Sequence, residues 1–481
     1  MARIAPLHAW PAAIAARFGA RPPAGQKRRS ARPAPVFGVI AGMLSLAAAL
    51  PAAAQSLEPV KPEDVGLSSE RLERIGQVFN REIDQGKLPG AVVLVARKGR
   101  VAYFQSFGFR DKPAQSPMTK DALFEIYSMT KPLVSVAAMM LVEEGRLQLA
   151  DPVSKYLPDF ANLQVSVPRF DATTGKLTYQ LTSLEHPMTV QDLLRHTSGL
   201  VYGDTTANAQ VRDAYVKAGI LKPNDATYDI RDLTADDEVA RLSKLPLAHQ
   251  PGTAWEYSVS VDVLGRVIEK VTGERLSDFL DERLFKPLKM VDTGFFIPPA
   301  NIGRQAQPLA TDPLTGAPQK LHDVSARPAN DSGGAGGVST AADYFRFAQM
   351  MLNGGWLDDA QILSRTTVGF MASDHLGPNV ARAMNPSDVT MGSPGYTFGL
   401  GFAVRPEPGI VAFPGSVGDY MWAGYAGTYF WIDPKEQLVA ILMTQAPGPT
   451  RQYYRREMRQ LVYQAITDRP ASAAAVNSAQ Q

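Results

Sequence analysis

The chain contains no cysteine among its 481 residues, so disulfides, thiolate nucleophiles, iron–sulfur clusters and cysteine-type zinc sites are excluded. Its six histidines stand in no metal-ligand spacing, and there is no His-Glu-x-x-His sequence. A Gly-x-Ser-x-Gly pentapeptide is also absent, so an α/β-hydrolase nucleophile turn has no support. The glycine-rich segment 332–337 lacks the Lys-Ser/Thr of a phosphate-binding loop, and we interpret it as a tight turn before a helix. The sequence therefore predicts no metal or nucleotide cofactor.

Charge of either sign is also in little excess. The formal net charge of +2 combines a basic start with an acidic remainder. The first 54 residues hold seven of the 49 basic residues and no acidic one, which leaves 42 basic against 47 acidic residues in the rest. A mildly acidic body gives no electrostatic case for a nucleic acid or an anionic membrane as a partner.

The basic start is typical of a secretory signal. The basic residues 27–29 precede the apolar run 36–50, and Pro51 and three alanines ending at Ala54 follow. The apolar run has about 15 residues, fewer than the roughly 20 that a membrane-spanning helix needs. We therefore predict cleavage after Ala54 and a periplasmic or secreted protein without an integral membrane anchor. An uncleaved anchor is the alternative.

Hydrophobic periodicity places strands near both ends of the mature chain and helices between them. In the first part it predicts a helix over 69–87, a hairpin over 90–109 and a helix over 128–144. Further helices are predicted over 189–195, 235–243, 259–272 and 341–352. In the last part, strands over 398–404, 420–425, 428–432 and 438–444 precede a final helix that includes Ile466.

This order predicts an α/β fold with one sheet built from both chain ends and an inserted, mostly helical region. We divide the chain into a signal peptide (1–54), a first part of the α/β domain (55–165), a mostly helical insert (166–325), a second part of the α/β domain (326–468) and a flexible tail (469–481).

The first candidate for chemistry is Ser128-Met129-Thr130-Lys131, at the start of the predicted helix over 128–144. Residues three apart lie on nearly the same helix face, so Lys131 is expected beside Ser128. A helix start also offers unpaired N–H groups and the positive end of the helix dipole. Both favour a serine that becomes an alkoxide and then an acyl ester. Ser-x-x-Lys alone is a weak signal, because surface serines and lysines often reach this spacing by coincidence.

Two later segments strengthen this signal. Tyr257-Ser258-Val259 offers a phenol as a second proton carrier, and Trp422-Ala423-Gly424 lies on a predicted strand. With Ser128 and Lys131 they resemble the ordered motifs of the penicillin-recognising serine hydrolases: S-x-x-K, then Y-x-N or Y-S-x, then K-T-G or W-x-G. The resemblance covers most of residues 60–465 and includes the segments 193–200, 333–343 and 430–434. More narrowly, the chain resembles family VIII carboxylesterases, which are similar to class C β-lactamases.

The resemblance implies a β-lactamase/transpeptidase-like fold, in which helices flank an antiparallel sheet and the site lies between the sheet and the helical region. It also implies that Ser128 is the acylated nucleophile and that Lys131 and Tyr257 share its proton as general base. The remaining implied site groups are the backbone N–H groups of Ser128 and Tyr425 as an oxyanion hole, with Trp422 and Gly424 in the substrate pocket.

Two residues depart from the β-lactamase pattern. Val259 stands where Y-x-N has its asparagine, and Trp422 stands where K-T-G has its cation. Both departures weaken recognition of a β-lactam, so we predict an exported serine hydrolase that cleaves small-molecule carboxylic esters through an acyl-enzyme. The alternative among enzymes is a β-lactamase or D-alanyl-D-alanine peptidase acting on amides. The alternative of another class is a catalytically inactive penicillin-binding-type sensor.

Several of these residues also have simpler structural interpretations. Tyr257 fits an ordinary half-buried tyrosine, and Trp422 fits a core residue of its strand, as Trp255 and Trp431 do. His196 stands close to Ser198 in sequence and suggests a serine–histidine pair. Its expected place at a helix end, before a turn, favours a capping or packing role instead.

Overall fold

A computed structural model describes residues 57–221 and 229–468. The predicted signal peptide (1–54) and the predicted tail (469–481) lie outside the described residues. Within the described part, no helix has both the length and the apolar character needed to cross a bilayer.

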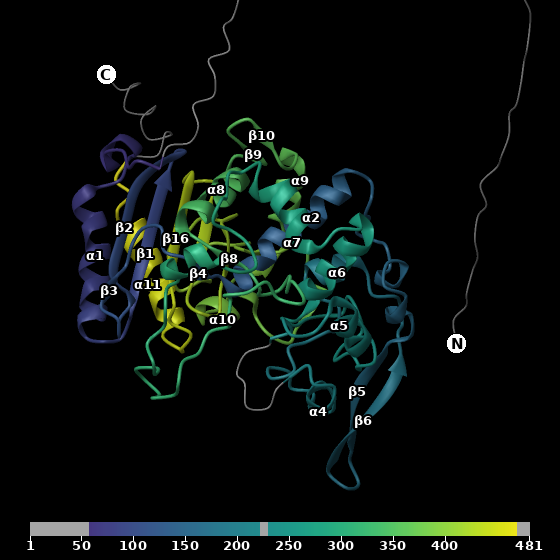
Figure 1. Cartoon of the computed structure of the whole chain (residues 1–481). Coiled ribbons are helices and arrows are strands. Elements are labelled where there is room, and N and C mark those ends of the chain that lie inside the picture. The colour runs from purple at the N-terminus through teal and green to yellow at the C-terminus, as the bar shows by residue number, and fades with distance from the viewer. Residues whose placement is uncertain (1–56, 222–228, 469–481) are drawn as a thin grey trace, which may run out of the picture. The chain divides into compact units, whose positions relative to one another are not determined.

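An eight-stranded sheet joins the two ends of the chain, in the order β12-β13-β14-β15-β16-β1-β2-β3. Its centre is the antiparallel pair of β1 (Gly90–Arg97) and β16 (Leu438–Thr444), where Val93 lies opposite Leu442. Figure 1 shows the blue strands β1 and β2 beside the yellow C-terminal strands. The other strands are β2 (Arg100–Asp111), β3 (Ser116–Pro117), β12 (Thr397–Phe398), β13 (Ala403–Val404), β14 (Tyr420–Ala423) and β15 (Tyr429–Asp433). The prediction of one sheet from both ends is confirmed.

Helices cover both faces of this sheet. Every residue of β1 and of β16 is therefore buried. The helix α1 (Ser69–Asp84) buries Leu72, Ile75 and Phe79, which fall on one face at helical spacing. It contacts β2 and the last helix, α11 (Arg451–Tyr463). The helix α8 (Ala341–Leu352) packs on β1, β15 and β16. Figure 1 shows α1 and α8 on opposite sides of the strands.

The middle of the chain forms a helical region around α2 (Thr130–Glu143) and α6 (Ser260–Thr272), which contact each other. Its other helices are α3 (Val190–Leu194), α4 (Ala209–Lys217), α5 (Ala235–Leu242) and α7 (Leu276–Leu280). Two further helices, α9 (Arg365–Met371) and α10 (Pro386–Met391), precede β12. Two-residue strands pair as β4 (Phe124–Glu125) with β8 (Val338–Ser339), β7 (Ala254–Trp255) with β11 (Ala381–Arg382) and β9 (Trp356–Leu357) with β10 (Ala360–Gln361).

A hairpin inside the helical region was not predicted. Strands β5 (Gln164–Asp171) and β6 (Lys176–Ser183) form a separate two-stranded sheet. Most of their residues are exposed, including the apolar Phe170 and Leu177 opposite each other near the tip. A strand exposed on both faces needs no regular alternation of apolar and polar residues, so periodicity does not reveal it.

Two predicted elements differ from the structure. The segment 398–404 is a tight hairpin of β12 and β13, because the Gly399 N–H donates to the Phe402 carbonyl (2.8 Å) and Gly401 takes a positive φ of 93°. The helix predicted from Ser128 begins instead as a 3₁₀ turn over Tyr127–Met129, and α2 follows from Thr130.

Candidate active site

Hydrogen bonds of Thr130 fix the turn that carries Ser128. Tyr127 adopts a φ of +44°, an uncommon conformation for a residue with a side chain. The Thr130 hydroxyl donates to the Tyr127 carbonyl (2.6 Å) and accepts from the Gly337 N–H (2.9 Å). Tyr127, Met129 and Thr130 are buried while Ser128 is partly exposed. The local fold therefore presents Ser128 to a cavity and keeps its neighbours in the core.

Lys131 is almost completely buried, and its ammonium contacts three oxygens. Its Nζ lies 3.5 Å from the Ser128 Oγ, 3.0 Å from the Tyr202 hydroxyl and 2.8 Å from the Gly334 carbonyl oxygen. Three acceptors match the three N–H donors of an ammonium group. The structure thus brings Lys131 to Ser128, as the spacing predicts, and adds two partners from distant parts of the chain.

Tyr257 also lies against Lys131. The Nζ of Lys131 is 4.7 Å from the centre of the Tyr257 ring, which is 5.3 Å from the Tyr202 ring. The Tyr257 hydroxyl is buried, and its side chain contacts Tyr202. Burial raises the pKa of Tyr202 well above its ordinary value, so Tyr202 remains protonated at neutral pH.

The Trp422-Ala423-Gly424 segment forms the end of β14 and the turn after it. Trp422 is fully buried, and its ring packs against Tyr257 (5.3 Å between ring centres) and Phe398 (5.2 Å). A Cβ on Gly424 would lie 2.3 Å from the Ile126 carbonyl oxygen, so only glycine permits this close approach to the segment before Ser128. Trp255 and Trp431 are buried core residues, as predicted.

Two backbone N–H groups near Ser128 are available to a ligand. Among the described residues, no hydrogen bond uses the N–H of Ser128 or of Tyr425, whereas the Gly424 N–H is bonded to the Thr428 carbonyl (2.9 Å). Both residues line the same cavity. Two free N–H groups beside a candidate nucleophile can stabilise negative charge on a substrate oxygen.

The cavity around Ser128 has a volume of about 220 Å³. Its lining includes Ser128, Tyr257, Trp422, Gly424 and Tyr425. All five residues were predicted site residues, and Lys131 lies behind them against Ser128. The structure therefore gathers the whole predicted constellation at one place, from segments that are more than 100 residues apart in sequence.

Sequence reasoning missed the cations of this cavity. Arg451 and Arg455, on α11, line the wall that Tyr425 also forms, and the Arg451 guanidinium lies 4.9 Å from the Tyr425 ring centre. Burial lowers the pKa of both arginines from the ordinary value. Neither has a carboxylate partner within the described part of the chain. The substitution of Trp422 for a cation thus does not leave the cavity without positive charge.

Tyr202 and Gly334 were also missed as partners of Lys131. Tyr202 comes shortly after the segment 193–200, and Gly334 lies in the segment 332–337 that we interpreted as a turn. The segments 193–200 and 333–343 resemble the hydrolase family, and this was the available signal. The distances that give these residues a role depend on tertiary contacts and not on local spacing.

His196 does form a contact with a serine, but not one suited to catalysis. Its Nδ1 lies 3.0 Å from the Ser258 Oγ, and Ser258 is completely buried. Burial lowers the pKa of His196 well below its ordinary value, so the ring is neutral. Its ring packs against Trp255 and Tyr257. This agrees with the predicted packing role.

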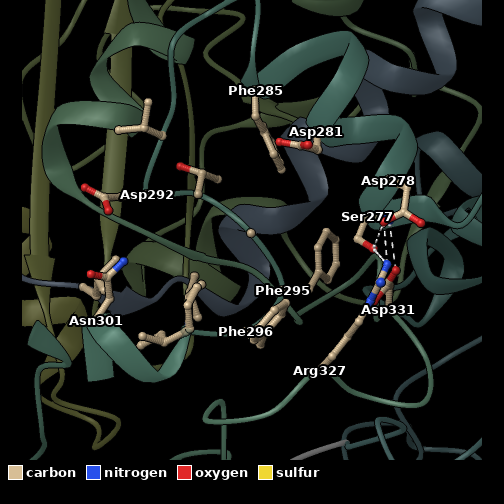
Figure 2. Close-up of a pocket in the computed structure, with 17 residues that line it drawn as sticks. Ser277, Asp278, Asp281, Phe285, Asp292, Phe295, Phe296, Asn301, Arg327 and Asp331 are labelled. Atoms are coloured by element: carbon tan, nitrogen blue, oxygen red, sulfur yellow. Dashed lines mark hydrogen bonds and ion pairs between the residues drawn. The ribbon is translucent and has the colours of Figure 1, made fainter. Parts of the chain in front are cut away.

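A second cavity, of about 260 Å³, is shown in Figure 2. It combines the aromatic rings of Phe285, Phe295 and Phe296 with aspartates at its rim. The Asp278 carboxylate is paired with Arg327 (2.5 Å), as the dashed lines in Figure 2 show. None of the predicted site residues lines this cavity, whereas five of them line the cavity around Ser128. In the ranges that the structure covers, no group of acidic or histidine side chains is arranged to hold a metal ion.

Known proteins are similar to this chain in sequence. The sequence model of the family described as Beta-lactamase matches residues 75–464. Esterase EstB of Burkholderia gladioli is 31% identical over 391 residues, which span 77% of this chain and 89% of EstB. A putative D-alanyl-D-alanine carboxypeptidase of Escherichia coli K12 is 26% identical over 419 residues, which span 80% of this chain and 85% of that protein.

A solved structure extends the likeness to the fold. EstCE1, described as a hydrolase with promiscuous acyltransferase activity, superposes with a TM-score of 0.66 at 27% identity. The match covers 82% of this chain and 99% of EstCE1.

Proposed function

The chain belongs to the β-lactamase family of penicillin-recognising serine hydrolases, and we propose that it cleaves carboxylic esters through an acyl-enzyme formed on Ser128. The observation that carries this proposal is the contact of a buried lysine amine with a partly exposed serine in a cavity that also offers two free backbone N–H groups. The likeness to esterase EstB and to EstCE1 supports a hydrolase that acts on esters.

In the proposed acylation step, the Ser128 Oγ attacks the ester carbonyl carbon while its proton passes to the Lys131–Tyr257 pair. The N–H groups of Ser128 and Tyr425 stabilise the negative charge that develops on the carbonyl oxygen. The C–O bond to the alcohol then breaks, and Tyr257 returns the proton to the leaving alkoxide. Water then attacks the acyl-enzyme carbonyl while its proton passes to the Lys131–Tyr257 pair. The ester bond to Ser128 breaks, the Ser128 Oγ takes the proton back, and the acid is released.

A second candidate function is hydrolysis of a β-lactam or a D-alanyl amide. The observation that favours it is the placement of Arg451 and Arg455 in the cavity, because a guanidinium can hold the carboxylate that these substrates carry. The likeness to a putative D-alanyl-D-alanine carboxypeptidase points the same way. An inactive sensor is less well supported, since the nucleophile, the lysine and the tyrosine lie together at the cavity.

The two enzyme functions differ in what the Trp422 wall contributes. We expect short-chain p-nitrophenyl esters to show a kcat/KM well above that of nitrocefin, because the indole gives apolar contact to a neutral ester but no charge to a carboxylate. Loss of one charge-assisted hydrogen bond costs about 1.5–3 kcal/mol, which is roughly tenfold to a few hundredfold in affinity. In Trp422→Lys, the ratio of kcat/KM for p-nitrophenyl butyrate to that for nitrocefin should fall, chiefly through weaker ester turnover.

Trp422→Phe is the matched control, because it keeps an aromatic wall beside Tyr257 and introduces no buried charge. Arg451→Gln tests the other source of positive charge. If nitrocefin is the better substrate of the wild type, the ester proposal is wrong. If the ratio is unchanged in Trp422→Lys but nitrocefin turnover falls in Arg451→Gln, the carboxylate contact belongs to α11 and Trp422 is not the selector.

We further propose that the protein is exported. The basic and apolar order of residues 27–50 supports this. Mature protein isolated from the native host is expected to begin at Gln55 or within a few residues of it, as read by N-terminal sequencing. A soluble cytoplasmic protein that begins at Met1 would contradict the proposal.

A further inference from the structure

The segment 330–337 supplies a carbonyl group to Lys131, and buried side chains hold it in place. Arg266 donates to the Asn330 side chain (2.5 Å) and to the Asp331 carbonyl (2.8 Å). The Asp331 carboxylate accepts from Arg275 (2.6 Å) and from the Ser277 N–H (2.9 Å). The first two residues of the segment are therefore fixed before the chain reaches Gly334.

Asp262 holds the next part of the segment. It lies on α6, five residues after Tyr257, and is completely buried. Its Oδ1 accepts from the Ser332 hydroxyl (2.5 Å) and from the Gly334 N–H (3.0 Å). The carbonyl of the same Gly334 accepts from the Lys131 Nζ (2.8 Å). One glycine thus links the Asp262 carboxylate to the lysine amine.

The packing of Gly334 against Asp262 leaves no room for a side chain at position 334. A Cβ on Gly334 would lie 2.2 Å from the Asp262 Oδ2, so a larger residue would displace either the carboxylate or the turn. The Oδ2 itself is buried without a hydrogen-bond partner within the described part of the chain. Leaving a buried carboxylate oxygen unpaired is costly, so folding stability alone does not account for this residue.

Asp262 and Lys131 also interact through their charges. Burial raises the pKa of Asp262 above its ordinary value, and the positive charge of Lys131 opposes this rise. The other charged groups that face Asp262 are Glu238, on α5, and Arg266, one helical turn along α6.

We propose that Asp262 is a positioning residue for the reaction at Ser128: through Ser332 and Gly334 it places the carbonyl that holds Lys131, and its charge balances the Lys131 ammonium. This inference rests on the proposed role of Ser128 and Lys131. Asp262 does not line the cavity and touches no substrate, so its effect is expected on the acylation rate and not on binding.

The test compares Asp262→Ala, which removes the acceptor and the charge, with Asp262→Asn, which keeps a side-chain oxygen acceptor. We expect the rate of Ser128 labelling by a fluorophosphonate to fall tenfold or more in Asp262→Ala, as for loss of part of a proton relay. In the kinetics of this labelling, the limiting rate kinact should carry the loss and KI should remain within about twofold, since binding is untouched. Asp262→Asn should recover part of the rate.

A second comparison separates position from charge. Asp262→Asn removes the charge but keeps an oxygen acceptor for Ser332 and Gly334, whereas Ser332→Ala keeps every charge and removes only the hydroxyl donor. If position dominates, Ser332→Ala should lower the labelling rate severalfold, with KI unchanged.

The matched control is Glu238→Gln. Glu238 is also completely buried and bonds to the side chain of Asn330 (2.7 Å), but it contacts neither Ser332 nor Gly334. We expect it to lower Tm about as much as Asp262→Asn while its labelling rate stays within about threefold of the wild type. Equal loss of labelling in Glu238→Gln and Asp262→Ala, or a wild-type labelling rate in Asp262→Ala, would overturn the proposal.

Failure of the proposed function gives a different result. If wild-type protein is not labelled at Ser128, the role of Ser128 is wrong. If Ser128 is labelled at a rate that Asp262 does not affect, only the positioning role is wrong.

Discussion

Ser128→Ala is expected to lower kcat for p-nitrophenyl butyrate by about 10⁴-fold or more and to remove the burst of p-nitrophenol. Loss of the nucleophile of a serine hydrolase has effects of this size, because the remaining groups stabilise charge but cannot form an acyl-enzyme. Stopped-flow release of p-nitrophenol measures the burst and the steady state in one experiment.

The control for Ser128→Ala is Ser258→Ala. Ser258 is the serine beside His196, and it is completely buried and bonded to the Ser260 Oγ (2.6 Å). It should keep the burst amplitude of the wild type even if its Tm falls. Because Ser128 is partly exposed and makes few contacts, Ser128→Ala should unfold at nearly the same temperature as the wild type. A full burst in Ser128→Ala would remove the basis of the mechanism.

The second large effect concerns the proton relay. Lys131→Ala and Tyr257→Phe should each lower kcat by about 10²–10⁴-fold, the usual contribution of general base catalysis. The double variant should lose far less than the product of the two single losses, because both groups would carry the same proton. The measurement is a double-mutant cycle on kcat at constant pH, with Tm recorded for each protein.

Tyr202→Phe is a matched comparison for Tyr257→Phe, since each removes one hydroxyl from a tyrosine that contacts Lys131. Burial raises the pKa of Tyr202, so its hydroxyl stays protonated and no tyrosinate is available there to accept a proton. Its contact with the Lys131 Nζ suggests that it holds the amine in place. We therefore expect a smaller loss in Tyr202→Phe than in Tyr257→Phe. Fully multiplicative losses in the Lys131/Tyr257 cycle, or a larger effect of Tyr202→Phe, would contradict the assigned roles.

The sequence predicts those parts of the fold that depend on local patterns. The strand over 438–444 is a continuous apolar run, and the structure shows it with the same bounds because both of its faces are buried. The helix over 341–352 is likewise found as predicted. The β5–β6 hairpin was missed because its strands are exposed, and the segment 398–404 because its glycines allow a tight turn.

In the candidate site, too, residues in local motifs could be predicted and residues that depend on tertiary contacts could not. Ser128 and Lys131 share a local spacing, and Tyr257 and Trp422 occur in motifs of an ordered set, so sequence alone was sufficient to name them. Tyr202, Gly334, Asp262 and the arginines of α11 acquire their roles from contacts between segments far apart in the chain. No pattern in a single sequence reports such distances.

The most direct test of the account is the site of covalent modification by a fluorophosphonate. Intact-mass spectrometry of the treated protein should show one adduct per chain, and peptide mapping should place it on Ser128. The adduct should be absent in Ser128→Ala and should form slowly in Lys131→Ala. No adduct on the wild type, or an adduct on Ser198 or Ser258, would contradict the assignment of Ser128 as the nucleophile.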